Sequence, residues 1–379
     1  MRRLLPLLCG LLLAACGQRA ARPIGDFTLP VYTPRYASGF EITGAAGSRS
    51  TLVTVHNPWY GDEVTDQYLF IARDGEPAPA GFEGQVLRDE ARRVVCMSGS
   101  YIAMLDALGA ANRVVGVSGA QYLINETLRR RIARGEAADV GFDSNVDFER
   151  LMALRPDLVM LYGIGGADTA LTGKLRELGI PYLYMGEHCE ESPLGKSEWV
   201  VVAAEIAGLR TEGSRLFAAI PERYERLRAL AQQTAARPRV MLNTPYRDTW
   251  FMPARNSYMV RLLEDAGARY VFEENTATQT LPIDIEQAYY LTSKSDFWLN
   301  VSGCNTLDEV RRQNPRLADT PPVREGRVYD NNRRRNAAGG SDFWESGVLR
   351  PDRVLADLVH IFHPELSETD ELYYYRQLE

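Results

Sequence analysis

Apolar and polar positions follow two different periods along most of the chain. From Arg92 onward, short apolar runs that end in small residues are followed by stretches whose apolar residues lie three or four positions apart. The first pattern is typical of buried strands and the second of helices. Strands that alternate with helices at this spacing predict parallel sheets that are covered by helices on both faces.

These predicted elements form two groups, separated by a long segment without strand signals. The predicted strands lie at 94–100, 114–119, 157–163 and 181–186 in the first group, and at 239–245, 269–272, 296–303 and 326–331 in the second. The predicted helices lie at 101–113, 147–156, 171–180, 257–268, 284–294 and 351–366. The pattern therefore predicts two α/β lobes.

The segment between the two groups predicts a long helix. Leu216, Ile220, Tyr224, Leu227 and Leu230 keep helical spacing within residues 211–236. Pro221 falls inside this run and predicts a kink or a local break. A helix of this length can run the length of a domain.

Residues 17–90 differ from the rest of the chain. The runs at 51–59 and 67–77 read as strands, and the second stops at a turn. We therefore expect a β-rich N-terminal extension at 17–90, an N-terminal lobe at 91–197, a bridging helical segment at 198–236 and a C-terminal lobe at 237–379.

The first sixteen residues read as a targeting segment. Arg2 and Arg3 precede an apolar stretch, Leu4–Leu13, that is too short to span a bilayer. The stretch ends in Leu-Ala-Ala-Cys16, which resembles the lipobox of bacterial lipoproteins and implies a signal peptide at 1–16 with lipid on Cys16. Two or more acyl chains anchor a protein stably. The alternative is an ordinary secretory signal with a chance cysteine. We expect a chain that is lipid-anchored in a bacterial membrane and faces the periplasm or the cell exterior.

Length, charge and cysteine count narrow the class of protein. The chain has 379 residues, which suits two domains, and its net charge of −7 argues against a nucleic-acid partner. Cys96, Cys189 and Cys304 remain after the targeting segment and show no metal-ligand spacing. They allow one disulfide at most, and buried free thiols are the simpler reading. His, Asp and Glu residues also form no cluster with metal-ligand spacing, so a bare metal ion is not the expected cargo.

The two lobes contain a similar helix-then-strand unit. DFERLMALRPDLVMLYG runs from Asp147 to Gly163, and DIEQAYYLTSKSDFWLNVSG runs from Asp284 to Gly303. Together with RVVCMSGSYIAMLDALGAANRVVGVSG and the ending PDRVLADLVHIFHPEL, these stretches resemble the substrate-binding proteins of ABC importers for ferric siderophores, haem and cobalamin. The resemblance covers about residues 90 to 366, and its specificity lies in the ordered set of motifs.

The resemblance implies a fold of two doubly wound, Rossmann-like lobes that are bridged by one long α-helix and hold ligand between them. It also implies that an exposed Glu on each lobe docks onto the importer's permease, whose ATPase drives transport. The matching positions are Glu149 and Glu286, each near the start of a predicted helix. Capping of that helix is the ordinary alternative for such a residue.

Ligands of open α/β sheets bind outside the carboxyl ends of the strands, and those ends give the expected ligand contacts. Aromatic faces there suit a corrin, porphyrin or catecholate ring, and arginine forks suit anionic oxygens. Half of the tyrosines can equally fill the core, and the arginine run at 333–335 can be a solvated loop. The expected ligand-binding residues are Tyr101, Tyr122, Tyr162, Trp250, Phe251, Arg255, Asn300, Arg333, Arg335 and Trp344.

The sequence leaves the cargo open. A ferric siderophore or a similar iron chelate fits the arginines and aromatics, and cobalamin and haem are alternatives. Haem would need a His or Tyr ligand, for which His188, Tyr101, Tyr122 and Tyr162 are candidates. No permanently bound cofactor is expected. The chain has no P-loop, GxSxG or correctly spaced GxGxxG motif, so an enzyme is not expected. A tethered sensor or cargo chaperone on the same fold is the rival function.

Overall fold

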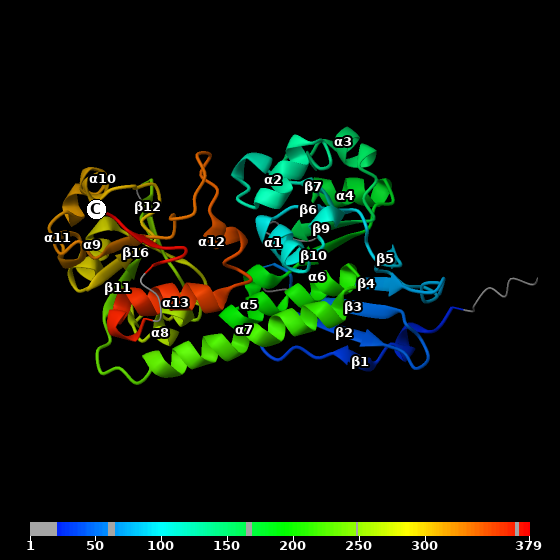
Figure 1. The fold of residues 1–379 in the computed structure, drawn as a ribbon, viewed down its shortest axis with the longest axis horizontal. Coiled ribbons are helices and arrows are strands. Elements are labelled where there is room, and N and C mark those ends of the chain that lie inside the picture. Colours follow the sequence, from blue (N-terminus) through cyan, green and yellow to red (C-terminus); the bar gives the residue numbers. More distant parts are fainter. Residues whose placement is uncertain (1–20, 60–64, 164–168, 248, 368–370) are drawn as a thin grey trace, which may run out of the picture.

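A computed structural model of the chain describes residues 21–59, 65–163, 169–247, 249–367 and 371–379. Within them, the chain forms an N-terminal extension and two α/β lobes joined by a long helix (Figure 1). The prediction of two doubly wound lobes with one bridging helix is confirmed. Cys16 and the targeting segment lie outside the described residues. No helix in the described ranges is both long and apolar enough to cross a membrane.

The N-terminal extension is a five-stranded sheet with the order β1-β2-β3-β4-β5. Its strands pair antiparallel except for β4 and β5, which are parallel. The sequence pattern indicated only the third and fourth of these strands. The strands are β1 (Leu29–Tyr32), β2 (Phe40–Gly44), β3 (Thr51–His56), β4 (Asp66–Ala72) and β5 (Gln85–Arg88).

The N-terminal lobe, called the N-lobe below, contains a parallel sheet with the order β10-β9-β6-β7-β8. The chain starts in the centre at β6, moves outward to β8, and then returns to the other side with β9. Its strands are β6 (Val94–Cys96), β7 (Val114–Val117), β8 (Ala138–Asp139), β9 (Leu158–Tyr162) and β10 (Tyr182–Met185), and its helices are α1 (Gly99–Ala107), α2 (Glu126–Ala133), α3 (Phe148–Ala153) and α4 (Ala170–Glu177).

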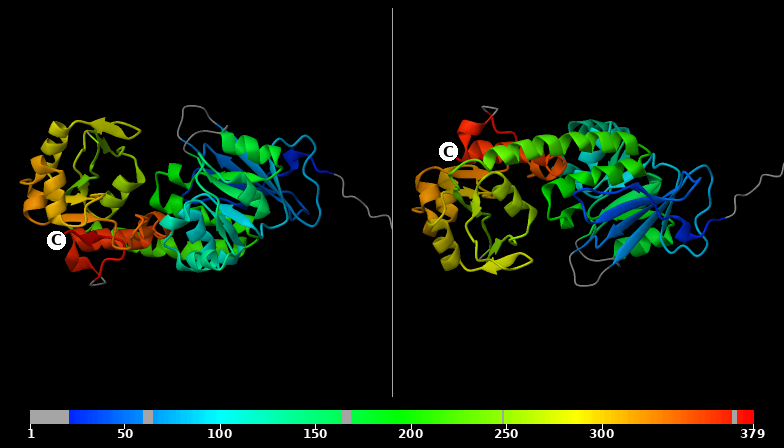
Figure 2. Two further views of the ribbon diagram at one scale, coloured as in Figure 1. Left: turned by 90° about the horizontal axis from the view of Figure 1, so that it is seen from above. Right: turned by 90° about the horizontal axis from the view of Figure 1, so that it is seen from below.

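Three helices lead from this lobe to the next: α5 (Pro193–Glu198), α6 (Val200–Ile206) and α7 (Arg210–Ala231). Helix α7 runs along both lobes, as the view from below in Figure 2 shows. It continues through Pro221 without an interruption, so the predicted local break does not occur. Its buried face carries the predicted apolar positions Ile220, Tyr224 and Leu227.

The C-terminal lobe, called the C-lobe below, contains a second sheet with the order β14-β11-β16-β17-β18. It is parallel except at β18, the last strand of the chain. A separate antiparallel sheet of β12, β13 and β15 stands beside it. The strands are β11 (Arg239–Leu242), β12 (Pro245–Tyr246), β13 (Thr249–Met252), β14 (Arg269–Tyr270), β15 (Leu281–Ile283), β16 (Phe297–Leu299), β17 (Val328–Asp330) and β18 (Arg376–Gln377). The helices are α8 (Tyr258–Asp265), α9 (Ile285–Ser293), α10 (Leu307–Gln313), α11 (Pro321–Arg324), α12 (Asp342–Glu345) and α13 (Pro351–Phe362).

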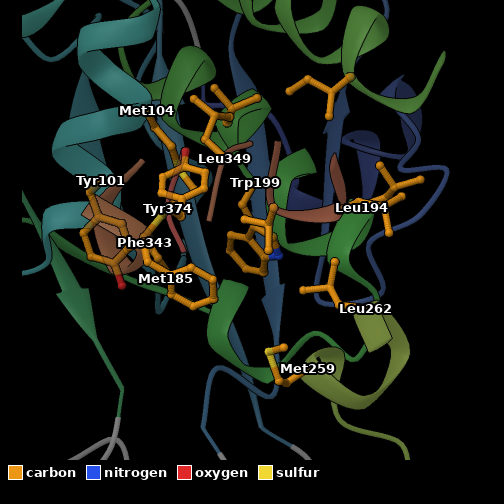
Figure 3. Close-up of a cluster of buried hydrophobic side chains, with 14 of the residues drawn as sticks. Tyr101, Met104, Met185, Leu194, Trp199, Met259, Leu262, Phe343, Leu349 and Tyr374 are labelled. Atoms are coloured by element: carbon orange, nitrogen blue, oxygen red, sulfur yellow. The ribbon is translucent and has the colours of Figure 1, made fainter. Parts of the chain in front are cut away.

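One apolar core continues from the N-lobe into the C-lobe. Phe343 of α12 packs in a buried cluster with Tyr101 and Met185 of the N-lobe and Tyr374 of the C-lobe (Figure 3). Burial of such side chains is the main favourable term in folding. The lobes are therefore joined by packing as well as by α7.

The three cysteines of the described chain are free thiols, and Cys96 and Cys304 are buried. Burial raises the pKa of Cys304 to about 11, so this thiol stays protonated at neutral pH. No disulfide forms among these residues, in agreement with the simpler reading of the sequence.

Candidate functional site

The carboxyl ends of the parallel strands in the two lobes face each other. In the loop after β17, Asn336 donates from Nδ2 to the carbonyls of Gln121 (2.9 Å) and Leu123 (3.2 Å), which follow β7. After β10, Glu191 forms an ion pair of 3.2 Å with Arg261 of α8. Residues beyond the strand ends of one lobe thus contact residues beyond the strand ends of the other. We call this region the inter-lobe site; it comprises residues 98–100, 118–122, 162–163 and 186–191 of the N-lobe and 243–247, 249–257, 300–302 and 331–345 of the C-lobe.

Several aromatic side chains predicted for the ligand site are accessible there. Tyr122 is 43% exposed, Phe251 40% and Trp344 56%. Tyr162 is half-buried, and its ring lies 4.4 Å from that of His188. These four predicted residues can present rings to a ligand between the lobes.

Tyr101 does not line the site. Its side chain is fully buried, and its hydroxyl donates to the carbonyl of Leu161 over 3.2 Å. The residue follows β6 as predicted, but the first turn of α1 directs its ring into the core (Figure 3). The prediction of a ligand contact at Tyr101 is therefore wrong.

Trp250 and Asn300 are also structural residues. Trp250 is 1% exposed, stacks on Trp298 at 5.6 Å and donates from Nε1 to the carbonyl of Leu242 over 2.9 Å. Asn300 is buried, and its Oδ1 accepts from the hydroxyl of Tyr375 over 3.0 Å. Both side chains satisfy buried polar groups instead of facing solvent, so the predicted ligand contacts at these positions are wrong as well.

The arginine run at 333–335 divides into paired and unpaired side chains. Arg333 forms an ion pair of 3.0 Å with Glu371. Arg334 forms one of 2.6 Å with Asp342. Arg335 is exposed and has no ion pair with any carboxylate in the described part of the chain. Of the three guanidinium groups, that of Arg335 is therefore the most available to an anion.

Arg255, the remaining predicted arginine, lies after β13 and pairs with Glu264 of α8. Its side chain remains 41% exposed. A ligand would have to compete with Glu264 for this guanidinium.

Sequence reasoning missed a buried polar cluster at the end of β10. Glu187 accepts from the hydroxyl of Ser100 over 3.0 Å, and no described atom bonds to its second carboxylate oxygen. Burial raises the pKa of Glu187 to about 7. Burial also lowers the pKa of Lys196, whose ammonium lies 4.4 Å from the centre of the Tyr258 ring in the C-lobe. Burial thus favours the neutral form of both groups, which lie where the two lobes meet.

His188, one of the candidates for haem ligation, belongs to the same stretch. Burial lowers its pKa to about 4, so its ring is neutral at pH 7. Its Nε2–H donates to the carbonyl of Gly163 over 3.0 Å. This ring nitrogen is occupied by the backbone, which leaves the exposed phenol of Tyr122 as the more accessible candidate. No group of three or more His, Cys, Asp or Glu side chains that could hold a metal ion occurs in the described ranges.

The two predicted docking residues occupy equivalent places. Asp147 caps α3 by accepting from the Arg150 amide over 2.9 Å, and Asp284 caps α9 by accepting from the Gln287 amide over 2.8 Å. Glu149 and Glu286 each follow the cap by two positions and are exposed. Because the aspartates provide the caps, the glutamates are not needed for capping. Glu286 forms an exposed ion pair of 2.8 Å with Arg316.

Comparison with known proteins agrees with this architecture. The family described as periplasmic binding protein matches residues 94–333. The chain belongs to the periplasmic binding protein family. It is also 26% identical over 332 residues to the uncharacterized lipoprotein MJ0878 of Methanocaldococcus jannaschii, with 82% of this chain and 77% of that protein covered.

Two solved structures illustrate the shared fold. A periplasmic heme binding protein from Pseudomonas aeruginosa matches with a TM-score of 0.58 and 20% identity, over 76% of this chain and 98% of that chain. An ABC-type Fe3+-hydroxamate transport system protein from Saccharomonospora viridis matches with a TM-score of 0.53 and 17% identity, over 72% of this chain and 94% of that chain. At these identities the likeness shows the fold alone.

Proposed function

We propose that this protein captures an anionic iron complex between its lobes and delivers it to an ABC importer. The observation that carries this proposal is that accessible aromatic rings and a guanidinium without an ion pair among the described residues occur together at the facing strand ends. Tyr122, Phe251 and Trp344 supply the rings, and Arg335 supplies the cation. Rings bury large apolar faces, and a guanidinium fork binds anionic oxygens.

An iron chelate with planar rings, such as a catecholate siderophore, fits this combination. The named relatives of known structure are described as binding heme or transporting Fe3+-hydroxamate, which supports an iron complex as the class of cargo. Haem remains a candidate because the exposed phenol of Tyr122 is a suitable iron ligand. Cobalamin is the third candidate and depends on the aromatic rings alone. The iron here is part of the cargo, and the protein is proposed to carry no resident cofactor.

Membrane attachment through lipid on Cys16 is part of the proposal. It is supported by the lipobox-like sequence at Leu13–Cys16 and by the relative named as a lipoprotein. A diacylated cysteine would keep the two lobes beside the membrane that contains the importer.

The proposed docking surface consists of the two exposed glutamates and an apolar neighbour of each. Met152 lies three positions after Glu149 and is 47% exposed, and Tyr289 lies three positions after Glu286 and is 49% exposed. Residues three apart share a face of a helix, so each lobe offers a carboxylate beside an apolar side chain. Such a surface suits a permease with basic residues, and the charges would set register and association rate more than affinity.

Titration of the unlipidated chain, residues 17–379, tests the proposed function. The panel contains haemin, cyanocobalamin, a ferric catecholate and a ferric trihydroxamate, and the readout is tryptophan fluorescence. Trp344 is the expected reporter, because Trp250 is buried in the core. We expect saturable quenching by an iron complex and a loss of about tenfold or more in affinity for Arg335→Ala, the size of a charge-assisted hydrogen bond.

Arg333→Ala is the matched control for this experiment. It removes a neighbouring guanidinium that is already engaged with Glu371, so its effect on affinity should be within a factor of about two, as for an exposed ion pair. Equal losses for the two variants would contradict the role of Arg335. If no complex binds to the wild-type protein, the importer function is refuted and a tethered sensor or chaperone becomes the better interpretation.

A further inference from the structure

A segment of the N-terminal extension lies against the strand ends that form the inter-lobe site. Gly163 follows β9 and Gly186 follows β10. A Cβ atom on Gly163 would lie 2.5 Å from the carbonyl oxygen of Pro58, and one on Gly186 would lie 3.5 Å from the Cα of Pro58. The next residue, Trp59, packs edge-on against Tyr184 of β10 at 5.4 Å. Pro58 and Trp59 thus cover the carboxyl ends of two strands.

Pro58 lies close to Tyr162 and His188, whose rings contact each other in the N-lobe. Gly163, which contacts Pro58, also accepts the hydrogen bond from His188, and His188 lies against the ring of Tyr162. The absence of a side chain at Gly163 is what allows the Pro58 backbone to approach so closely. The extension and the predicted ligand contacts therefore share one edge of the N-lobe.

The extension is held there by buried carboxylates of the N-lobe. Glu190, just after β10, accepts from the amides of Ser38 (3.0 Å) and Gly39 (2.9 Å) and from the indole of Trp199 (3.0 Å). Gly39 in turn accepts from the amide of His56 at the end of β3 over 2.8 Å. Hydrogen bonds to a buried carboxylate are short and directional. They fix the end of β3, and with it the two residues that follow.

The matched part of the family begins at residue 94, so Pro58 and Trp59 lie outside it. We propose that Pro58 and Trp59 form an additional wall of the ligand site and favour cargo with a planar ring system. This inference rests on the proposed function, because it assumes that cargo lies between the lobes at these strand ends.

The aromatic ring of Trp59 favours a ligand with a planar ring system. The indole of Trp59 is half-buried, so one side packs on the N-lobe while part of the ring stays accessible. An accessible indole at the carboxyl end of β10 offers aromatic surface to a porphyrin, a corrin or a catecholate. A trihydroxamate, which has no aromatic ring, gains little from such a surface.

Affinity measurements on four proteins test this inference: the wild type, Trp59→Ala, Trp59→Phe and Phe82→Ala. Phe82 is a matched control, because it is also a half-buried aromatic of the extension that packs edge-on against another ring, Phe70, at 6.0 Å. It belongs to a separate apolar cluster with Phe27 and Leu52, away from the strand ends of the N-lobe. Haemin, cyanocobalamin, a ferric catecholate and a ferric trihydroxamate are the probes, and unfolding midpoints are recorded for all variants.

We expect Trp59→Ala to weaken binding of the planar probe that the wild type prefers by about tenfold, as for the loss of one aromatic pair. Trp59→Phe should retain most of the affinity, and Phe82→Ala should bind like the wild type. Unchanged binding by Trp59→Ala would overturn the inference, as would an equal loss in Phe82→Ala. Preference of the wild type for the trihydroxamate would also overturn it while leaving the proposed function intact. Failure of the wild type to bind any probe would refute both.

Discussion

The N-terminal extension and the C-lobe both share an apolar core with the N-lobe, but the extension is also held by several buried carboxylates. Glu198 of α5 is fully buried and accepts four hydrogen bonds from the extension. The donors are the hydroxyl of Tyr32 (2.7 Å) and the amides of Arg35 (2.8 Å), Tyr36 (2.7 Å) and Ala37 (2.7 Å). A second buried carboxylate, Glu205 of α6, accepts from the hydroxyl of Thr51 (2.7 Å) and pairs with Arg73 (3.1 Å).

The junction with the C-lobe depends mainly on apolar packing. Helix α7 packs against both α6 and α13, and Phe343 fills a shared core. One buried polar contact at this junction is that of Glu345 in α12, which accepts from the amides of Ile124 (2.9 Å) and Asn125 (2.6 Å).

This difference indicates which parts of the molecule should move together as one body. Apolar packing is non-directional, whereas hydrogen bonds to a buried carboxylate tolerate little displacement. We therefore expect the extension and the N-lobe to behave as one body, and relative motion to occur at the junction with the C-lobe. A wall built from the extension would then keep its place on the N-lobe when cargo enters or leaves.

The largest effect is expected from removing the carboxylate that holds the extension. Glu198→Ala leaves three backbone amides and a tyrosine hydroxyl without their acceptor, and we expect a loss of at least about 3 kcal/mol in the free energy of unfolding. Burial and the bond to Glu198 raise the pKa of Tyr32 far above its usual range, so this hydroxyl remains a donor at neutral pH. Urea unfolding at pH 7 measures the loss.

Glu222→Ala, an exposed carboxylate on α7, is the control and should leave the unfolding midpoint unchanged. Limited proteolysis of Glu198→Ala should cut first within residues 29–56, because the extension loses its anchor. A midpoint like that of the control would mean that apolar packing alone holds the extension, and the contrast between the two junctions would disappear.

The sequence predicted the lobes well because their strands are buried on both faces and their helices have one apolar side. Val114–Val117 and Tyr182–Met185 are buried throughout, as continuous apolar runs predict. The extension was harder to predict, because a strand such as Leu29–Tyr32 at its edge has no buried side and lacks an apolar period.

The candidate site was only partly predictable, for a related physical reason. Sequence order places a residue at a strand end but does not decide whether its side chain turns inward, as at Tyr101, or outward, as at Tyr122. Glu187, Glu190 and Glu198 were missed because carboxylates are mostly exposed, and only their tertiary donors explain their burial. These donors lie far away in the sequence.

A smaller effect that depends on pH is expected at the junction with the C-lobe. Burial raises the pKa of Glu345 from 4.5 to about 7, although the amides of Ile124 and Asn125 oppose the shift. The native state thus binds more protons than the unfolded state between these values, and stability falls as the pH rises through this window. Ionisation of the Glu345 carboxyl should lower the free energy of unfolding of the wild type by on the order of 1–3 kcal/mol between pH 5 and pH 8.

Glu345→Gln separates the charge from the hydrogen bonding. Glutamine keeps one acceptor and does not titrate, so the variant should lose less stability than the wild type over the same pH range. Urea unfolding at pH 5, 6, 7 and 8 gives the two profiles, with the exposed Glu222→Gln as the matched control. Parallel profiles for the wild type and Glu345→Gln would show that Glu345 is already ionised at pH 5, which would make this junction resemble that of the extension.

The smallest effect on stability is expected for substitution of the exposed carboxylates Glu149 and Glu286. Their substitution should have the largest effect on transport. Glu149→Gln and Glu286→Gln leave the helix caps at Asp147 and Asp284 intact. The double variant should unfold and bind cargo like the wild type, because its side chains lie in solvent outside both junctions. In vesicles that contain the importer, it should fail to stimulate uptake of bound cargo, since it lacks the charges that set register on the permease. Normal uptake would refute docking through these residues, and impaired cargo binding would show that they act inside the protein instead.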